Sequence, residues 1–339
     1  MKPNPRLALY SAGHFLIDFS CAFLLFRYLP QTAGRAELLL LYNFCAFALQ
    51  MPIGLLADRF GNCRVFAALG CVFTAAGMLF RAAALPLALF AGVGNALYHV
   101  GGGLDTLNES GRKAGRLGVF VSPGAFGLFL GGILGRGGFP APVVPALLLT
   151  AAAAILLLCR DSAPASVPSV RLPPAGLLLG LSLFAVVALR SWTGFLFRFG
   201  WKSGVWSWVF VLAVVLGKTL GGMLYDRIGA PAAAAASLGA AAVLFLFSDH
   251  PAAGVGAVLC FNMTMPLTLR WAADLLPKAK GFSFGLLTFA LFLGFLPAYS
   301  GVSLPASGRL YALLSLASLA LLIPGFRKDG VLTKFCSEP

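Results

Sequence analysis

The chain has 339 residues, of which 59% are hydrophobic and only 11% are charged. Soluble domains are about 45–50% apolar and about 25% charged, and they have too little interior to bury this much apolar surface. The formal net charge is +14, and the basic residues gather at the ends of apolar runs, as they do on the cytoplasmic side of membrane proteins. The composition therefore predicts a polytopic membrane protein, embedded in a lipid bilayer, that binds no nucleic acid.

Twelve apolar runs bounded by proline, glycine and charged residues are long enough to form membrane-spanning helices. In chain order they cover residues 6–29, 35–57, 63–82, 84–105, 115–137, 141–159, 174–197, 204–224, 231–248, 252–275, 281–300 and 306–325. We expect helices because lipid offers no partner to an unpaired backbone group. Twelve spans of about 20 residues use about 240 residues, which leaves no room for a soluble catalytic domain. Neither an enzyme nor a cofactor is expected.

Both ends of the chain are expected on the cytoplasmic side. Fifteen of the 25 lysines and arginines fall on the side of the termini, seven fall on the opposite side, and three fall within predicted spans. A stretch rich in proline and serine divides the chain nearly in half. This predicts an N-terminal six-helix bundle at 1–160, a cytoplasmic linker at 161–173, a C-terminal six-helix bundle at 174–326 and a cytoplasmic tail at 327–339.

One short motif follows the second predicted span of each half. It reads GLLADRFG at residues 54–61 and GMLYDRIG at residues 222–229. Six spans separate the copies, so both lie on one face of the membrane, as in a direct repeat. Its glycines allow close helix approach, and its aspartate is suited to the N-terminus of a helix from the other half. The candidate gating residues are Gly54, Asp58, Arg59, Gly61, Arg64, Gly222, Asp226, Arg227 and Gly229.

The duplicated motif resembles the loop motif of the major facilitator superfamily, and with the span count the resemblance covers essentially the whole chain. It implies an all-α membrane protein whose twelve transmembrane helices form two six-helix bundles, the major facilitator fold. It also implies alternating-access transport of a small molecule by a monomer. The expected location is the bacterial inner membrane.

The fifth predicted span is rich in glycine, in a pattern similar to that of proton-driven antiporters of the superfamily. The residues that carry this likeness are Gly118, Gly127, Gly131, Gly132 and Gly135. Close packing of helices through small residues is the other interpretation of the same pattern.

Within the superfamily, the chain resembles the fosmidomycin-resistance group of exporters. The likeness lies in His14 and Asp18 of the first span, His99 of the fourth, and Arg190-Ser191-Trp192 of the seventh. It extends to Met265-Pro266 in the tenth span. This resemblance implies proton-coupled efflux.

An aspartate deep in a span costs about 2.5–3.5 kcal/mol on insertion, so Asp18 needs a reason to be there. His14 lies one helical turn away on the same face. A buried carboxyl that takes up and releases a proton would explain both residues, and His14 is suited to share that proton. The alternative is that Asp18 only holds helices together through hydrogen bonds.

Arg190 lies within the seventh span and cannot lose its charge, so it requires a carboxylate or an anionic substrate. Asp18 and Arg190 come from opposite halves of the chain. We expect them to pair with each other in one transport state, and to bind a proton and a substrate instead in another. The alternative is that Arg190 extends to the membrane interface.

Other polar residues within spans are candidates for a substrate-binding cavity or, singly, for helix–helix hydrogen bonds. They are Asn43, Gln50, Asn95, His99 and Asn262, and Trp192 is a further candidate for the cavity. Lys218 is suited either to bind an anion from the inside or to extend its charge to the cytoplasmic membrane surface. Arg270 and Asp274, four residues apart, are expected to form an ion pair. The histidines are scattered along the sequence, so no metal site is expected.

The sequence favours a proton-coupled secondary transporter that exports a small organic solute, anionic or drug-like. Two alternatives stay open. One is an importer or symporter of an anionic metabolite. The other is a receptor or scaffold of the same fold that moves no solute.

Overall fold

The computed structural model describes residues 4–31, 34–160, 167–172, 174–301 and 304–323. Residues 161–166 and 173 of the predicted linker, and the whole predicted tail at 327–339, lie outside the described residues. Within the described part every regular element is a helix, which confirms the predicted all-α class.

Nine helical stretches in the described part are long and apolar enough to cross a membrane. They are Pro5–Tyr28, Arg35–Phe60, Cys63–Phe80, Ala84–Glu109, Gly115–Arg136, Gly176–Leu196, Val205–Ile228, Pro251–Leu275 and Lys280–Tyr299. Three shorter apolar helices are Val143–Leu158, Ala230–Phe245 and Gly308–Leu322. Each of the twelve predicted spans overlaps one of these stretches. The agreement is expected, because a helix that crosses a membrane must be apolar over its length, and the sequence shows this directly.

The chain divides into two compact units. Unit 1 comprises Met1–Glu109, Val119–Pro168 and Lys278–Phe289, and unit 2 comprises Ser110–Gly118, Ser169–Pro277 and Ala290–Pro339. Each unit therefore includes one short segment from the other half of the sequence. The boundaries proposed from the sequence for the two bundles stay a prediction.

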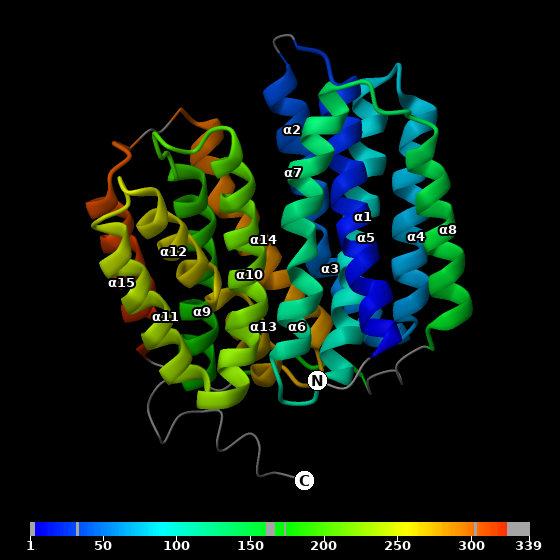
Figure 1. Cartoon of the computed structure of the whole chain (residues 1–339). Coiled ribbons are helices and arrows are strands. Elements are labelled where there is room, and N and C mark those ends of the chain that lie inside the picture. Colours follow the sequence, from blue (N-terminus) through cyan, green and yellow to red (C-terminus); the bar gives the residue numbers. More distant parts are fainter. Residues whose placement is uncertain (1–3, 32–33, 161–166, 173, 302–303, 324–339) are drawn as a thin grey trace. The chain divides into compact units, whose positions relative to one another are not determined.

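Unit 1 is built from the helices of the first half of the chain (Figure 1). These are α1 (Pro5–Tyr28), α2 (Arg35–Asn43), η1 (Phe44–Ala48), α3 (Gln50–Phe60), α4 (Cys63–Ala76), η2 (Gly77–Phe80), α5 (Ala84–Glu109), α7 (Pro123–Arg136) and α8 (Val143–Leu158). The first half of α14 (Lys280–Tyr299) and the end of α6 (Gly115–Val121) complete it. Helix α1 packs mainly against α7 and α5.

Unit 2 contains α9 (Pro174–Leu196), α10 (Val205–Ile228), α11 (Ala230–Phe245), α12 (Pro251–Asn262), α13 (Thr264–Leu275) and α15 (Gly308–Leu322). The start of α6 and the second half of α14 belong to it as well. Aromatic rings fill its interior around Phe197, whose ring lies 5.2 Å from that of Tyr311 and 5.3 Å from that of Phe245.

Glycines bring α7 into backbone contact with α1. A methyl group on Gly127, Gly131 or Gly135 would overlap the carbonyl oxygens of Phe15, Phe19 and Phe23, respectively. A methyl on Gly132 would make ordinary contacts with the ring of Phe26, at 3.4 Å, and with Arg136 Nη1, at 3.7 Å. Three of the antiporter-like glycines are therefore explained by close helix packing, and their relation to antiport stays a prediction.

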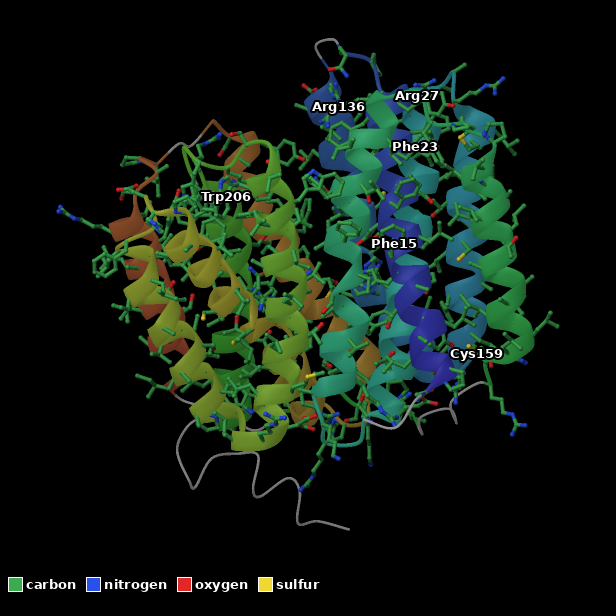
Figure 2. The ribbon with its side chains drawn as sticks, in the orientation of Figure 1. Phe15, Phe23, Arg27, Arg136, Cys159 and Trp206 are labelled. Carbon is green, nitrogen blue, oxygen red and sulfur yellow. The ribbon has the colours of Figure 1, made fainter. Side chains whose placement is uncertain are left out.

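The rings of Phe15, Phe19 and Phe23 stack along α1 at spacings of 5.9 and 6.2 Å. Figure 2 labels the first and last of them, with Arg27 at the following turn. Four-residue spacing puts the three rings on one face of the helix, and Phe139 packs edge-on against two of them. This aromatic column fixes the rotation of α1 and hence the direction of the polar residues on it.

Four predicted spans are not continuous α-helices. The third continues from α4 into the 3-10 turn η2, and the fifth is interrupted at Ser122, between α6 and α7. The second contains the π-helical turn η1, where the Gln50 amide donates to the Ala46 carbonyl oxygen at 2.6 Å. The tenth is interrupted at Met263, between α12 and α13. Pro266 has no amide hydrogen to give to the carbonyl of Asn262, which favours a break at that point. Such interruptions often mark functional positions in membrane helices.

Candidate functional site

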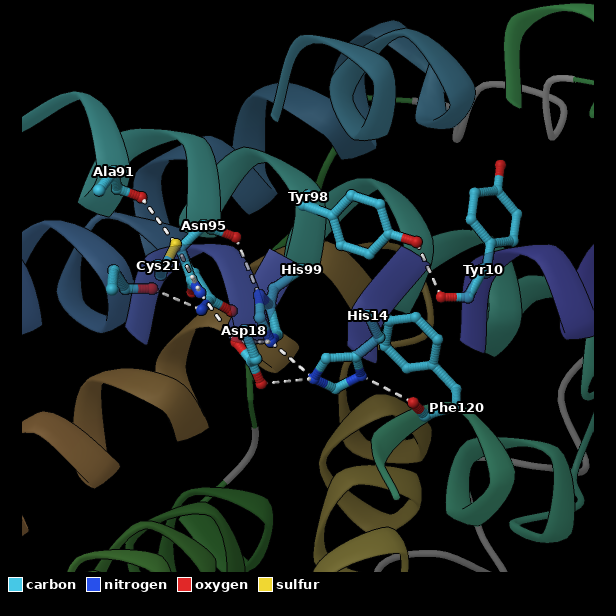
Figure 3. Close-up of polar contacts among 11 residues, drawn as sticks. Tyr10, His14, Asp18, Cys21, Ala91, Asn95, Tyr98, His99 and Phe120 are labelled. Atoms are coloured by element: carbon cyan, nitrogen blue, oxygen red, sulfur yellow. Dashed lines mark hydrogen bonds and ion pairs between the residues drawn. The ribbon is translucent and has the colours of Figure 1, made fainter. Parts of the chain in front are cut away.

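Four polar side chains meet in the interior of unit 1 (Figure 3). His14 and Asp18 come from successive turns of α1, and Asn95 and His99 come from successive turns of α5. All four are less than a tenth exposed. Asn95 Nδ2 donates to Asp18 Oδ1 at 2.9 Å, and Asp18 Oδ2 lies 3.3 Å from His14 Nε2. His99 Nε2 lies 2.8 Å from His14 Nε2. We call these four residues the His–Asp cluster.

Backbone carbonyls orient both imidazole rings. His14 Nδ1 lies 2.7 Å from the Phe120 oxygen, and His99 Nδ1 lies 2.9 Å from the Asn95 oxygen. A carbonyl oxygen only accepts hydrogen bonds, so each Nδ1 carries a hydrogen and donates it. Both Nε2 atoms then point at each other and at Asp18. A carbonyl on one ring nitrogen fixes which nitrogen carries the hydrogen, as it does for histidines that bind metals.

The structure changes the grouping predicted for this region. Asn95 and His99 were assigned to substrate binding, whereas the structure places them against Asp18 and His14, the pair assigned to proton coupling. His14 and His99 are 85 residues apart in the sequence but lie in one cluster in space. His14, Asp18 and His99 each offer one atom within 4.8 Å of the others, a spacing compatible with a bound cation. The expectation of no resident metal stays a prediction.

Gly124 belongs to this site and was not found from the sequence. A methyl group there would overlap Asp18 Oδ2 and His14 Nε2. Gly124 lies on the face of α7 that also presents Gly127, Gly131 and Gly135 to α1. Continuing that glycine series one turn toward the N-terminus would have identified it.

A second buried polar group lies in unit 2 around Arg190 of α9. Its side chain is 8% exposed. Nη1 donates to Thr264 Oγ1 at 3.4 Å and to Thr268 Oγ1 at 3.5 Å. Both hydroxyls donate to carbonyls of their own segment, so their oxygens are free to accept from the guanidinium. None of the described carboxylates of unit 2 forms an ion pair with Arg190.

The two threonines come from the first turns of α13, directly after the break in the tenth predicted span. Asn262 ends α12 at this break, and its amide donates to the Val258 carbonyl oxygen at 2.8 Å. The break therefore gathers Asn262, Thr264 and Thr268 near the level of Arg190. Trp192 is half-buried two residues further along α9.

Three further predicted binding residues, Asn43, Gln50 and Lys218, lie on α2, α3 and α10, respectively. Asn43 directly precedes the π-helical turn, and Gln50 is fully buried against Ala46. Lys218 is half-buried on α10. Arg270 pairs with Asp274 and also donates to the Gly111 carbonyl, which confirms the predicted ion pair.

Each copy of the repeated motif holds the N-terminus of another helix in its own unit. In unit 1, Asp58 accepts from the amides of Gly281 and Phe282, at the start of α14, both at 2.8 Å. In unit 2, Asp226 accepts from the amides of Ala114 at 2.7 Å and Gly115 at 3.1 Å, at the start of α6. The predicted contact between the aspartate and a helix N-terminus is confirmed in both copies.

Glycines of the motif allow this approach. A methyl on Gly54 would overlap the Gly281 carbonyl, and a methyl on Gly222 would lie 2.5 Å from the Ala114 oxygen. Gly61 and Gly229 end their helices with positive φ angles of 71° and 80°, a backbone conformation that glycine adopts without strain. Arg64 donates to the carbonyls of Leu156 and Cys159 at the end of α8.

A pattern typical of serine hydrolases, G-x-S-x-G, occurs at residues 281–285 as GFSFG. In such enzymes the serine lies on a strand-to-helix turn with its hydroxyl exposed. Ser283 instead lies in the first turn of α14, is 1% exposed, and donates to the Lys280 carbonyl at 2.8 Å. The motif here forms the helix N-terminus that Asp58 binds.

No family model matches this chain, and no curated protein sequence matches it. Solved structures do match. A variant of the E. coli fucose:proton symporter FucP superposes with a TM-score of 0.67 at 15% identity, over 94% of this chain and 97% of that one. FucP in the outward conformation gives 0.65 at 14%, with the same coverage. The human organic anion transporter MFSD10 (TETRAN) gives 0.67 at 17%, over 95% of this chain and 100% of that one. The chain therefore has the major facilitator fold.

Proposed function

We propose that this chain is a secondary transporter that uses a proton gradient to export a small organic solute, anionic or drug-like, by alternating access. The observation that carries the proposal is the buried His–Asp cluster. Ionisable groups enclosed in membrane helices are costly and typically mark ion or proton pathways. FucP, which shares the fold, is a fucose:proton symporter.

The substrate class follows from Arg190. A buried guanidinium without a carboxylate partner is costly to keep, and an anionic ligand would offset that cost. The threonine and asparagine groups at the break between α12 and α13 add hydrogen-bonding capacity beside it. MFSD10, a structural neighbour, is an organic anion transporter. We therefore infer an organic anion as the preferred solute, carried by a monomer in the bacterial inner membrane with both termini cytoplasmic.

An importer or symporter of an anionic metabolite is the second candidate, because FucP couples its substrate to protons in symport. Export is favoured by the antiporter-like glycine series and by the likeness to fosmidomycin-resistance exporters in His14, Asp18, His99 and Arg190. The two candidates make opposite predictions about direction.

Direction can be measured in membrane vesicles from an exporter-deficient host. A tolerance screen with organic anions first identifies a compound that only the cells with the wild-type chain survive. Inside-out vesicles with an acidic interior should then accumulate this compound, and collapsing the pH gradient should release it. Accumulation in right-side-out vesicles with an acidic exterior would instead establish import and contradict the proposal.

We infer that the motif aspartates act as gates that hold helix ends together in one transport state. Asp58→Ala should increase amide exchange at residues 281–282, because those amides lose a charged acceptor. Such hydrogen bonds contribute about 1.5–3 kcal/mol, which corresponds to about 10- to 150-fold faster exchange. Hydrogen–deuterium exchange on the purified protein measures this effect.

Asp226→Ala is the matched control for this experiment. It should increase exchange at residues 114–115 and leave residues 281–282 as in the wild type. Both variants should also slow transport. Normal transport in both variants, despite faster exchange, would contradict the gating role while leaving the hydrogen bonds intact as structural features.

A further inference from the structure

The two histidines of the His–Asp cluster face each other in an arrangement in which two neutral rings cannot form a hydrogen bond. Both Nδ1 atoms are committed as donors to the carbonyls of Phe120 and Asn95. A neutral imidazole has only one N–H, so each neutral ring would present a bare Nε2 lone pair. These two nitrogens lie 2.8 Å apart, which is hydrogen-bond distance with no hydrogen between them.

Changing the tautomer of one ring does not resolve the conflict. If His14 or His99 carried its hydrogen on Nε2, its Nδ1 would turn a lone pair toward a buried carbonyl oxygen at 2.7 or 2.9 Å. A buried acceptor facing another acceptor is unfavourable. One additional hydrogen between the two Nε2 atoms satisfies all four ring nitrogens at once.

The charge of that additional proton is balanced nearby. Asp18 Oδ2 lies 3.3 Å from His14 Nε2, and Asp18 Oδ1 lies 3.8 Å from His99 Nε2. Asn95 donates to Oδ1 at 2.9 Å and holds the carboxylate in place. The protonated pair and the carboxylate together are neutral, which a buried site tolerates far better than an isolated charge.

The other groups of unit 1 that contact the cluster, within the described part of the chain, are uncharged. On α1, the Cys21 thiol donates to the Ala91 carbonyl, and on α5 the Tyr98 hydroxyl donates to the Tyr10 carbonyl. From α6, the carbonyl and the ring of Phe120 face the cluster, and from α7 Gly124 does so. The remaining titratable neighbours in unit 1 are the Tyr42 phenol and the Cys71 thiol. No lysine or arginine pairs with Asp18 among the described residues of unit 1.

We propose that the cluster carries its proton between His14 Nε2 and His99 Nε2, with Asp18 as the fixed counter-anion. His99 is then part of the proton site and not of the substrate site. The role of this proton in transport rests on the proposed function, whereas its location is a property of the protein itself. The two are therefore tested by separate measurements.

The location of the shared proton can be measured by nitrogen-15 NMR of purified wild-type protein with labelled histidine. The chain has three histidines, and His250 is exposed, so the spectrum is simple. We expect one far-downfield N–H resonance coupled to Nε2 of two different rings, with both Nδ1 atoms protonated. It should vanish in His99→Gln and persist in the matched control His250→Gln. Two neutral rings, or an Nε2–H coupled to a single ring, would overturn the proposal.

A bound metal ion is the other cation that two facing lone pairs and a carboxylate would accept. The wild type and His99→Gln are therefore compared by elemental analysis, before and after treatment with a chelator. We expect the molar ratio of metal to protein to be near zero in both samples. A metal ion retained by the wild type and lost in His99→Gln would overturn the assignment of the bridge to a proton.

Transport supplies the third measurement. One coupled proton gives about tenfold accumulation of solute per unit of pH gradient. In His99→Gln this accumulation should fall to none, while solute-for-solute exchange without a gradient continues. If His99→Gln accumulates solute like the wild type and Asp18→Asn does not, the shared proton has no role in coupling, and the proposed function stands. If the wild type itself ignores the gradient, the proposed function fails and the NMR result stands alone.

Discussion

Asp18→Asn should abolish movement of the solute driven by a pH gradient. The substitution keeps the size of the side chain and its hydrogen bond with Asn95, but removes the negative charge beside the two imidazoles. Removing one partner of a buried ion pair costs about 3–5 kcal/mol. Without this counter-anion, an added proton on the imidazoles would be an uncompensated buried charge, so its uptake during the transport cycle is disfavoured.

The measurement is solute flux in proteoliposomes with an imposed pH gradient, together with solute-for-solute exchange at equal pH. Asp18→Asn should lose the first activity and keep the second, because the binding group in unit 2 is untouched. Asp249→Asn is the matched control, since Asp249 is exposed at the end of a loop. Gradient-driven flux in Asp18→Asn equal to that of the wild type would contradict the proposed coupling.

The spans could be predicted from the sequence because they depend on a property of single segments. A helix that crosses lipid must be apolar over about 20 residues, and the run of side chains records this directly. The contacts of Asp58 and Asp226 were also predictable, because the motif occurs twice and its chemistry fits a helix N-terminus. Pairing within one helix, as between His14 and Asp18, follows from the spacing alone.

The completed cluster was not predictable in the same way. His99 meets His14 only because α5 and α1 pack with one particular rotation, which depends on glycines and on the phenylalanine column of α1. Sequence position indicates the depth of a polar residue in the membrane but not the neighbour that it faces. From the sequence alone, Asn95 and His99 are polar residues of a span like Gln50, and their partners on α1 cannot be identified. The donor role of each Nδ1 depends on backbone oxygens, which no sequence pattern marks.

Arg190→Gln should weaken binding of the anionic solute and raise the thermal stability of the protein. The guanidinium is 8% exposed and has two long hydrogen bonds to threonine hydroxyls, with no partner carboxylate among the described residues of unit 2. A hydrogen bond to a charged group contributes about 1.5–3 kcal/mol. Its loss should raise the KM for an organic anion about 10- to 150-fold, with much less effect on a neutral solute.

Stability separates binding from a structural role. If Arg190 only held helices together, Arg190→Gln would lower Tm and leave KM unchanged. If it is a desolvated charge kept for the substrate, replacing it removes an unpaired buried cation, and Tm should rise. Arg190→Lys retains the positive charge but not the planar guanidinium with its several N–H donors. It should therefore bind the anion more tightly than Arg190→Gln and less tightly than the wild type. Arg198→Gln, at an exposed position just beyond α9, should change neither quantity. Because the expected gain in stability accompanies a loss of binding, no general damage to the fold can produce the predicted result.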